Sequence, residues 1–495
     1  MPSVAPIQHP DQLFIGGKWV PPSGTTRFDV LNSSTEELFV SVAEAQAADM
    51  SAAVAAARQA FDHGPWPCMT HAERARYMQA IAAEMALRAD DQASTWVIES
   101  GVVQAIAGPR SKSVASVWEF YAGLAATFPF QEVHKPAVAN TGLLVREPVG
   151  VVAAIIPWNG PLLMVAYKCA PALLAGCTVI VKGSPEAPGA AYLFAEVCEK
   201  VGLPPGVVNV VIAERAVSEL LVRNPDVDKV TFTGSTAAGR RIASICGERI
   251  ARCTLELGGK SAAVILDDYD VEQAARTLSG MATFLTGQVC SSLTRIIVDR
   301  KRHDALVEAL SACFSKVKIG DPFDLSTQMG PLAMRRQRDR VEGYIQRGKQ
   351  EGARLAGGGG RPAHLHRGYF IEPTVFANVD NRSTIAQEEI FGPVLSVIPA
   401  DGEEAAIQIA NDTLYGLNNS VFTNDIDRAY QAARRLRSGT VGHNSVRSDF
   451  GIAFGGFKQS GLGREGGVEG LLPFLEAKTL LLDAMPTERV CSALY

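Results

Sequence analysis

One cysteine, Cys290, stands in a setting that could serve nucleophilic chemistry. It lies in a Thr-Gly-Gln-Val-Cys-Ser-Ser run, between an apolar helix-like segment at 274–285 and a β-type run at 295–298. A short connection between packed elements can present a side chain to a cleft. A thiol attacks only as the thiolate, and with an ordinary pKa of about 8.5 only a few per cent is ionised near neutral pH. Catalysis by Cys290 would therefore need a base, donors for an oxyanion and an acceptor for whatever leaves.

Four other short motifs contain side chains suited to those tasks. Asn159 follows an apolar strand, where its amide could donate to an oxyanion, although a turn asparagine is the commoner use. The Thr-Gly-Ser turn at 233–235 opens a helix, and helix N-termini attract anions. Glu256 ends a strand before two glycines, and the Glu-Glu-Ile-Phe-Gly-Pro segment at 388–393 has two adjacent acids. Each motif alone is weak, because turns and surface edges use the same residues without a ligand.

Two regions of alternating strands and helices must position these motifs. Near-continuous apolar strands at βαβ spacing indicate a parallel sheet covered on both faces, which binds ligands at the carboxyl ends of its strands. The second alternation, from about 261 to 441, predicts a second α/β domain. The strands expected in the first region are 149–156, 179–181, 207–212 and 229–232.

The flanking segments give further expectations. A glycine hairpin is predicted at 13–20, and a capping box at Thr70–Glu73 predicts a helix to about Arg88. Another helix is expected over 113–127. The tail at 479–482 reads as a short apolar strand far from any hairpin partner, which invites pairing with another chain.

The composition is that of an ordinary globular protein. The chain has 495 residues, 47% hydrophobic and 20% charged, which suggests about three folding units. A net charge of −5 gives no reason to expect nucleic acid or a membrane surface as partner. No secretory signal or membrane-spanning run is evident. Nine scattered cysteines without CxxC pairs fit reduced thiols in a cytoplasmic protein, and neither they nor the eight histidines are spaced as metal ligands.

Together, in this order and at these separations, the motifs closely resemble the NAD(P)-dependent aldehyde dehydrogenase superfamily. The resemblance runs from Gly-Gly-Lys-Trp at 16–19 to Pro-Phe-Leu-Glu at 473–476. It implies an α/β fold with a Rossmann-type cofactor domain, a second α/β catalytic domain and a small β oligomerisation flap that pairs subunits into a dimer or tetramer. The implied limits are 1–123 with 148–258 for the cofactor domain, 259–474 for the catalytic domain, and 124–147 with 475–495 for the flap.

The resemblance also implies a role for each matching residue. Cys290 attacks the aldehyde, Asn159 and the Cys290 N–H hold the oxyanion, a hydride passes to nicotinamide, and Glu256 activates the water that hydrolyses the thioester. A base that activates water argues against the CoA-acylating relatives, in which a thiol takes the place of water in this step. Glu465 resembles the family's second acid, which relays protons from Glu256, and a structural role for it is equally open. The residues implied in cofactor binding are Ile155, Ile156, Pro157, Trp158, Lys182, Ser184, Pro185, Glu186, Gly234, Ser235, Leu257, Glu389 and Phe391.

The sequence departs from the family at two places. At Pro185 many relatives carry a glutamate that binds the adenosine ribose and disfavours a 2′-phosphate. Here the acid is Glu186, so we expect NAD and leave NADP open. Gly160 stands where many relatives have a large aromatic residue. The absence of that side chain widens the substrate tunnel.

Because none of these motifs offers an Arg, Lys or carboxylate to a charged substrate, we expect a bulky hydrophobic aldehyde, aromatic, medium-chain or terpenoid. The alternative is that the lining merely packs and the enzyme is a generalist. The expected pocket residues are Gly160, Met164, Tyr167, Leu285, Val289, Ser291 and Phe450.

Two other classes of protein share part of this pattern. A thiol-dependent hydrolase or acyltransferase could use Cys290 and Glu256 without a cofactor, but the motifs at 233–235 and 389–391 speak against it. A binding protein that kept the fold is disfavoured, because nucleophile, base and oxyanion donor are all present.

Overall fold

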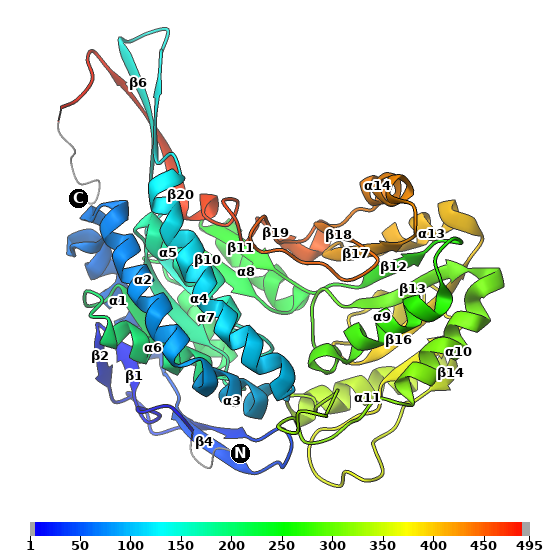
Figure 1. The fold of residues 1–495 in the computed structure, drawn as a ribbon. Coiled ribbons are helices and arrows are strands. Elements are labelled where there is room, and N and C mark those ends of the chain that lie inside the picture. Colours follow the sequence, from blue (N-terminus) through cyan, green and yellow to red (C-terminus); the bar gives the residue numbers. More distant parts are fainter. Residues whose placement is uncertain (1–4, 488–495) are drawn as a thin grey trace.

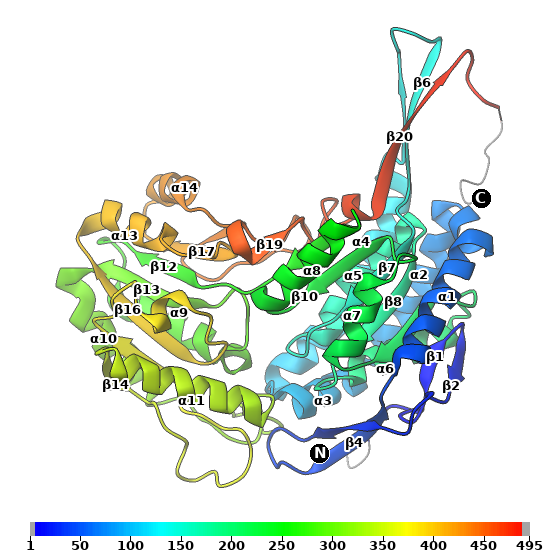
Figure 2. The same ribbon diagram turned by 180° about the vertical axis from the view of Figure 1, so that it is seen from behind.

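The computed structural model describes residues 5–487 and shows two α/β lobes side by side, with a narrow β extension rising from the first lobe (Figures 1 and 2). No helix among the described residues is long and apolar enough to cross a membrane. Seven cysteines are free thiols, but Cys68 is disulfide-bonded, so the expectation of reduced cysteines throughout is wrong at that position.

The sheet of the first lobe has the order β19-β11-β10-β7-β8-β9-β1-β2. Its five central strands are parallel, and the chain runs from β7 outward to β9 on one side before returning to β10 and β11 on the other. The order therefore reverses between β7 and β10, which is where open α/β sheets bind ligands. The strands are β1 (Leu13–Ile15), β2 (Lys18–Val20), β7 (Val151–Ile155), β8 (Thr178–Gly183), β9 (Val208–Ile212), β10 (Lys229–Thr233), β11 (Arg252–Glu256) and β19 (Gly461–Leu462).

Helices cover both faces of this sheet because successive strand side chains point to opposite sides. Val152 and Ala154 pack against α2, α4, α5 and α6, while Val151, Ala153 and Ile155 pack against α1, α7 and α8. The helices are α1 (Ala47–His63), α2 (His71–Leu87), α3 (Ala89–Ser100), α4 (Gln104–Thr127), α5 (Pro161–Ala175), α6 (Gly189–Lys200), α7 (Arg215–Arg223) and α8 (Thr236–Glu248).

The predicted hairpin and the capping box of α2 are confirmed, but one helix was missed and the start of another is wrong. Helix α3 was not expected, because only Arg88 separates it from α2. Helix α4 begins at Gln104, nine residues before the predicted start, and runs through Pro109. A Gly-Pro pair, here at 108–109, is more typical of a turn or loop than of the first turns of a helix.

The second lobe has a sheet of order β14-β15-β16-β13-β12-β17-β18, parallel except for β14. The short link Leu257–Lys260 joins the carboxyl end of β11 to the amino end of β12, so these two edges of the sheets face each other. The elements of the second lobe are β12 (Ser261–Ile265), α9 (Val271–Thr283), β13 (Leu293–Asp299), α10 (His303–Phe314), α11 (Arg335–Gln350), β14 (Arg354–Gly357), β15 (Thr374–Ala377), α12 (Thr384–Gln387), β16 (Val394–Ala400), α13 (Gly402–Asn411), β17 (Asn418–Phe422), α14 (Ile426–Arg435) and β18 (Thr440–His443).

The extension is a three-stranded antiparallel sheet of β5 (Gln131–His134), β6 (Thr141–Pro148) and β20 (Leu475–Leu482). The tail strand is therefore not unpaired, because Thr479 lies opposite Leu144 and the pairing extends along all of β20. Its partner lies more than 300 residues away in sequence, beyond the reach of hairpin reasoning. The end of the predicted flap, 488–495, lies outside the described residues.

Candidate active site

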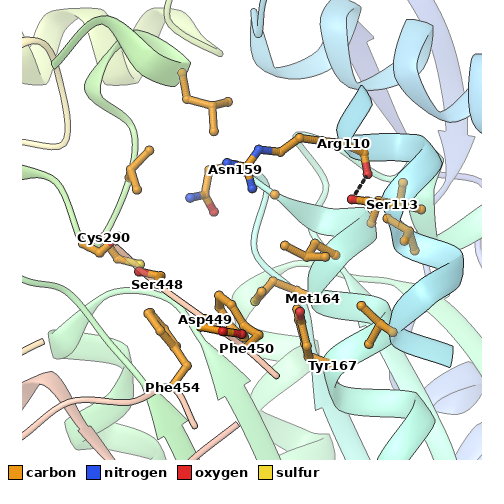
Figure 3. Close-up of a pocket in the computed structure, with 18 of the residues that line it drawn as sticks. Arg110, Ser113, Asn159, Met164, Tyr167, Cys290, Ser448, Asp449, Phe450 and Phe454 are labelled. Atoms are coloured by element: carbon orange, nitrogen blue, oxygen red, sulfur yellow. Dashed lines mark hydrogen bonds between the residues drawn. The ribbon is translucent and has the colours of Figure 1, made fainter. Parts of the chain in front are cut away.

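A cavity of about 950 Å³ lies where the two sheet edges meet (Figure 3). Cys290, Glu256 and Asn159 all line it, although they come from three separate segments. The seven residues expected in the substrate pocket also line it, namely Gly160, Met164, Tyr167, Leu285, Val289, Ser291 and Phe450.

Cys290 lies on a turn just before β13, and the residues ahead of it hold an unusual backbone. Leu285 and Thr286 have positive φ angles of 50° and 55°, followed by Gly287 at 73°. A Cβ on Gly287 would lie 2.3 Å from the Gly392 carbonyl carbon, so only glycine fits. The Thr286 hydroxyl donates to the Gly330 carbonyl at 3.0 Å. Such strain persists only where neighbouring contacts hold it, and here it points the cysteine at the cavity.

The Asn159 amide is fixed beside that turn. Its Nδ2 donates to the carbonyl oxygen of Gln288 at 3.0 Å, two residues before the cysteine. The backbone carbonyl of Asn159 accepts the Trp96 indole N–H at 2.8 Å. Because a side-chain amide carries two N–H donors, one remains free for an oxygen bound next to Cys290.

Glu256 ends β11 and is 2% exposed. Neither of its carboxylate oxygens has a hydrogen-bond partner among the described residues. Burial, and then the charge of Glu465, raise the pKa of Glu256 well above its ordinary value, while Lys168 and Arg464 act against the rise. A buried carboxyl group with a raised pKa at the edge of a cavity is a candidate general base.

Burial also raises the pKa of the Cys290 thiol to about 12, with smaller contributions from Glu389 and Glu256. Both shifts disfavour the charged forms of these two groups, and burial is the main cause of each. Both groups gain reactivity as they lose a proton, so the site becomes more reactive as the pH rises.

Glu465, the predicted second acid, is buried and forms an ion pair with Lys168 of α5. The Thr231 hydroxyl also donates to its carboxylate, at 3.3 Å. Sequence reasoning missed Lys168, although a lysine in the middle of an otherwise apolar helix was a usable signal. A buried lysine needs a charged or polar partner, and here that partner adjoins the candidate base.

The residues expected to bind a cofactor follow the carboxyl ends of β7, β8 and β10. Residues 155–158 end or follow β7, and Gly234 precedes α8, whose N-cap is Ser235. A Cβ on Gly239 would lie 2.4 Å from Leu257, so this glycine lets α8 pack closely against the link between the lobes.

Lys182, near the carboxyl end of β8, lies close to Glu186, which follows the strand. Burial lowers the pKa of Lys182 to about 8, and Glu186 opposes the change. Burial alone would raise the pKa of Glu186, but hydrogen bonds from Ser184 and Arg336 bring it below its ordinary value. The Arg336 bond, at 2.6 Å, comes from α11 and joins the two lobes at this point.

On the second lobe, the Glu389 carboxylate accepts the Gly259 N–H at 3.0 Å, and burial raises the pKa of Glu389 to about 7. A Cβ on Gly258 would lie 2.3 Å from a carboxylate oxygen of Glu389, so the double glycine allows a close approach. The rings of Trp158 and Phe391 meet edge to face, with centroids 5.4 Å apart. The expected cofactor residues of both lobes therefore converge.

Comparison with known proteins agrees with this arrangement. A profile of the aldehyde dehydrogenase family matches residues 19–480. The chain belongs to the aldehyde dehydrogenase family. Geranial dehydrogenase of Castellaniella defragrans is 44% identical to it over 477 residues, which cover 96% of this chain and 99% of that relative.

Solved structures of this family share the whole fold. A Mycobacterium tuberculosis aldehyde dehydrogenase complexed with NAD+ has a TM-score of 0.93 and 46% identity, covering 95% of this chain and 98% of its own. A mutant of aldehyde dehydrogenase C from Pseudomonas syringae, complexed with NAD+ and octanal, has a TM-score of 0.94 and 36% identity, covering 98% and 100%. The predicted family, enzyme class and fold are confirmed, and the cofactor-free hydrolase is not favoured.

The motifs offered no charged group to a substrate, but the cavity lining includes three charged residues from outside those motifs. Arg110, Arg447 and Asp449, here called the charged rim, line the same cavity and are exposed to solvent. Sequence reasoning missed them because they lie outside the family's motifs, on α4 and on the loop after β18. The aldehyde dehydrogenase therefore has an apolar cavity with charge at its solvent-accessible edge.

Proposed function

We propose that this enzyme oxidises bulky hydrophobic aldehydes to carboxylic acids with NAD+, through a covalent intermediate on Cys290. The observation that carries the proposal is the convergence of Cys290, Asn159 and Glu256 on one cavity at the meeting of two sheet edges. Nucleophile, oxyanion donor and base are the three parts that acyl transfer through a thiol requires.

In the first step, the deprotonated Cys290 sulfur attacks the carbonyl carbon and forms a thiohemiacetal. The developing negative charge on oxygen is held by the Asn159 amide, which already stands beside the cysteine turn, and by the backbone N–H of Cys290. The apolar walls exclude water, which strengthens both hydrogen bonds.

The residues present fit a nicotinamide dinucleotide. Helix α8 offers its N-terminal N–H groups for the pyrophosphate, while Lys182 and Glu389 are suited to the two riboses. Gly258, which has no side chain, lets the Glu389 carboxylate lie against the link between the lobes. When bound, the nicotinamide supplies the acceptor for the hydride lost from the thiohemiacetal carbon. Departure of that hydride leaves a thioester on Cys290.

Glu256 then takes a proton from water, and the resulting hydroxide hydrolyses the thioester and releases the acid. Because both oxygens of Glu256 are unpaired and its pKa is raised, it has no competing partner when it accepts that proton. Glu465 and Lys168 form a route by which the proton can leave, since they pair with each other and the charges of both act on Glu256.

Two features support NAD+ rather than NADP+. The Glu186 carboxylate is fixed next to Lys182 by Ser184 and Arg336, which keeps a negative charge where a 2′-phosphate would approach. Two of the similar solved structures are complexed with NAD+.

The lining supports a large apolar substrate. A Cβ at Gly160 would meet nothing within 4 Å, and Tyr167, Phe450 and Phe454 form a continuous ring stack with centroid separations of 4.2 and 4.3 Å. A relative named for geranial and a neighbour complexed with octanal agree with this size and polarity.

We also propose the domain limits stated above, a homo-oligomer formed through the flap, and a cytoplasmic location. Val133 and Leu481 of the flap are 62% and 51% exposed, which supports contact with a second copy of the chain.

The test is a substrate panel with both cofactors, followed by absorbance of the reduced nicotinamide. We expect a higher kcat/KM for octanal, benzaldehyde and geranial than for acetaldehyde, and for NAD+ than for NADP+. A preference for acetaldehyde would overturn the proposed substrate class. Absence of cofactor reduction with every aldehyde would overturn the proposed reaction.

A further inference from the structure

The three side chains of the charged rim differ in the hydrogen bonds that neighbouring groups provide. The Asp449 carboxylate accepts the Gly451 N–H at 2.7 Å, and the Arg447 Nε donates to the His443 carbonyl at 3.3 Å. Among the described residues, no hydrogen bond or ion pair engages the Arg110 guanidinium, which instead lies over the Phe284 ring with its central carbon 5.1 Å from the centroid. The rim thus holds two cations against one anion. Among the described residues neither cation has an ion-pair partner, and the Arg110 guanidinium also lacks a hydrogen bond.

Arg110 faces the substrate because of its place on α4. Cavity-lining residues recur along this helix at Arg110, Val114 and Val117, a spacing that puts them on one face. Figure 3 shows the Arg110 side chain reaching from α4 into the cavity, on the side of Asn159, while Ser113 donates to the Arg110 carbonyl at 2.8 Å behind it. Lys112 does not line the cavity, since two residues along a helix turn a side chain to the opposite face.

Much of the cavity wall is apolar. Met164, Tyr167 and Phe284 line it, and burial raises the pKa of the Tyr167 hydroxyl, with Asp449 adding to the rise and Arg110 opposing it. Arg110 and Asp449 therefore both lie near enough to Tyr167 to act on its hydroxyl. A ligand with an apolar body and a charged end would match this lining.

We propose that Arg110 binds a carboxylate at the end of the substrate remote from the aldehyde, so that the preferred substrates are long-chain ω-oxo acids or aldehydes with an equivalent terminal carboxylate. This inference rests on the proposed function and narrows its substrate class. A guanidinium offers paired donors that match a carboxylate, and the charge of Arg447 adds to the attraction. The single carboxylate of Asp449 disfavours a close approach on its own side and directs the anion toward Arg110.

The experiment compares aldehydes of six, eight and ten carbons in two series, one ending in methyl and one ending in carboxylate. For the wild-type enzyme we expect kcat/KM for the best ω-oxo acid to exceed that of the matching n-alkanal by about tenfold, as for a partly exposed charge-assisted hydrogen bond. The chain length with the largest difference reports the span from Cys290 to Arg110. The difference should shrink as salt is added.

Three variants identify the residue responsible. Arg110→Met should lower kcat/KM for the ω-oxo acid about tenfold and leave octanal within about twofold, while Arg110→Lys should keep part of the preference. Lys112→Met removes a charge from the same helix without touching the cavity and should change neither series. Equal losses of both series in Arg110→Met would show that Arg110 only shapes the wall, and would overturn the proposal.

Binding of the product provides a readout independent of turnover. By calorimetry, the wild-type enzyme should bind the eight-carbon dicarboxylate more tightly than octanoate, and Arg110→Met should lose that difference. If no aldehyde were oxidised, the proposed function would fail, and product binding would still decide the role of Arg110. Equal binding of the two acids, or a preference for ω-amino aldehydes through Asp449, would overturn the inference.

Discussion

The inner and outer walls of the cavity are built on different principles. The inner wall carries Cys290, Glu256 and Asn159 at strand ends or on the tight turn before β13, and Glu256 is 2% exposed. The outer wall is one face of α4 and the loop at 446–451, with exposed charges and the open space at Gly160.

This difference separates chemistry from specificity. Groups at the ends of paired strands are held by the hydrogen bonds of two sheets, so their mutual geometry is rigid. A helix face and a loop can change their side chains without disturbing those sheets. Substitutions on the inner wall should therefore reduce the rate for every aldehyde, whereas substitutions on the outer wall should change which aldehyde is preferred.

The largest expected effect is at the nucleophile. Cys290→Ala should abolish aldehyde oxidation for all substrates, because no covalent intermediate can form, while NAD+ binding measured by calorimetry persists. Oxidation remaining above the background of a mock preparation would move the nucleophile to another residue.

Asn159→Ala should lower kcat about 100- to 1000-fold for every aldehyde, the usual cost of one oxyanion donor. The loss should be similar for octanal and acetaldehyde, since the amide contacts only the reacting oxygen. Turnover at the parental rate would remove Asn159 from the oxyanion site.

Substitution of Glu465 and substitution of Lys168 should shift the pH profile of thioester hydrolysis in opposite directions. Glu256 must be deprotonated to act as a base, so the rate rises with pH through its raised pKa. Glu465→Gln removes a charge that raises this pKa, and the rising limb should shift to lower pH. Lys168→Met removes a charge that lowers it, and the limb should shift to higher pH.

The deacylation rate across pH in the two single variants checks this prediction, with the double variant expected to lie between them. Shifts of both single variants in one direction would mean that the pair acts on folding rather than on the base. Circular dichroism at each pH separates the two cases, because loss of one partner of a buried ion pair also destabilises the fold.

The smallest effect on the chemistry should come from the outer wall. Gly160→Leu adds a side chain into open space, so the protein should fold normally. It should lower kcat/KM for geranial severalfold and leave acetaldehyde nearly unchanged. A uniform loss for both aldehydes would show that this position belongs functionally to the inner wall.

The sequence by itself determined the inner wall. Cys290, Glu256 and the Asn159 segment each belong to a short contiguous motif, and the strand-and-helix alternation around them follows from local hydrophobic patterns. The aldehyde dehydrogenase family could therefore be identified before any contact was known. Local patterns also gave the capping box of α2 and the hairpin at 13–20.

Only the tertiary structure decided the partners that lie far apart in the chain. Lys168 meets Glu465 across 297 residues, and β20 pairs with β6 although more than 300 residues separate them. Arg110 and Asp449 share one cavity from α4 and from a loop of the other lobe. No local sequence pattern indicates such contacts, because they depend on how the packed sheets bring distant side chains together.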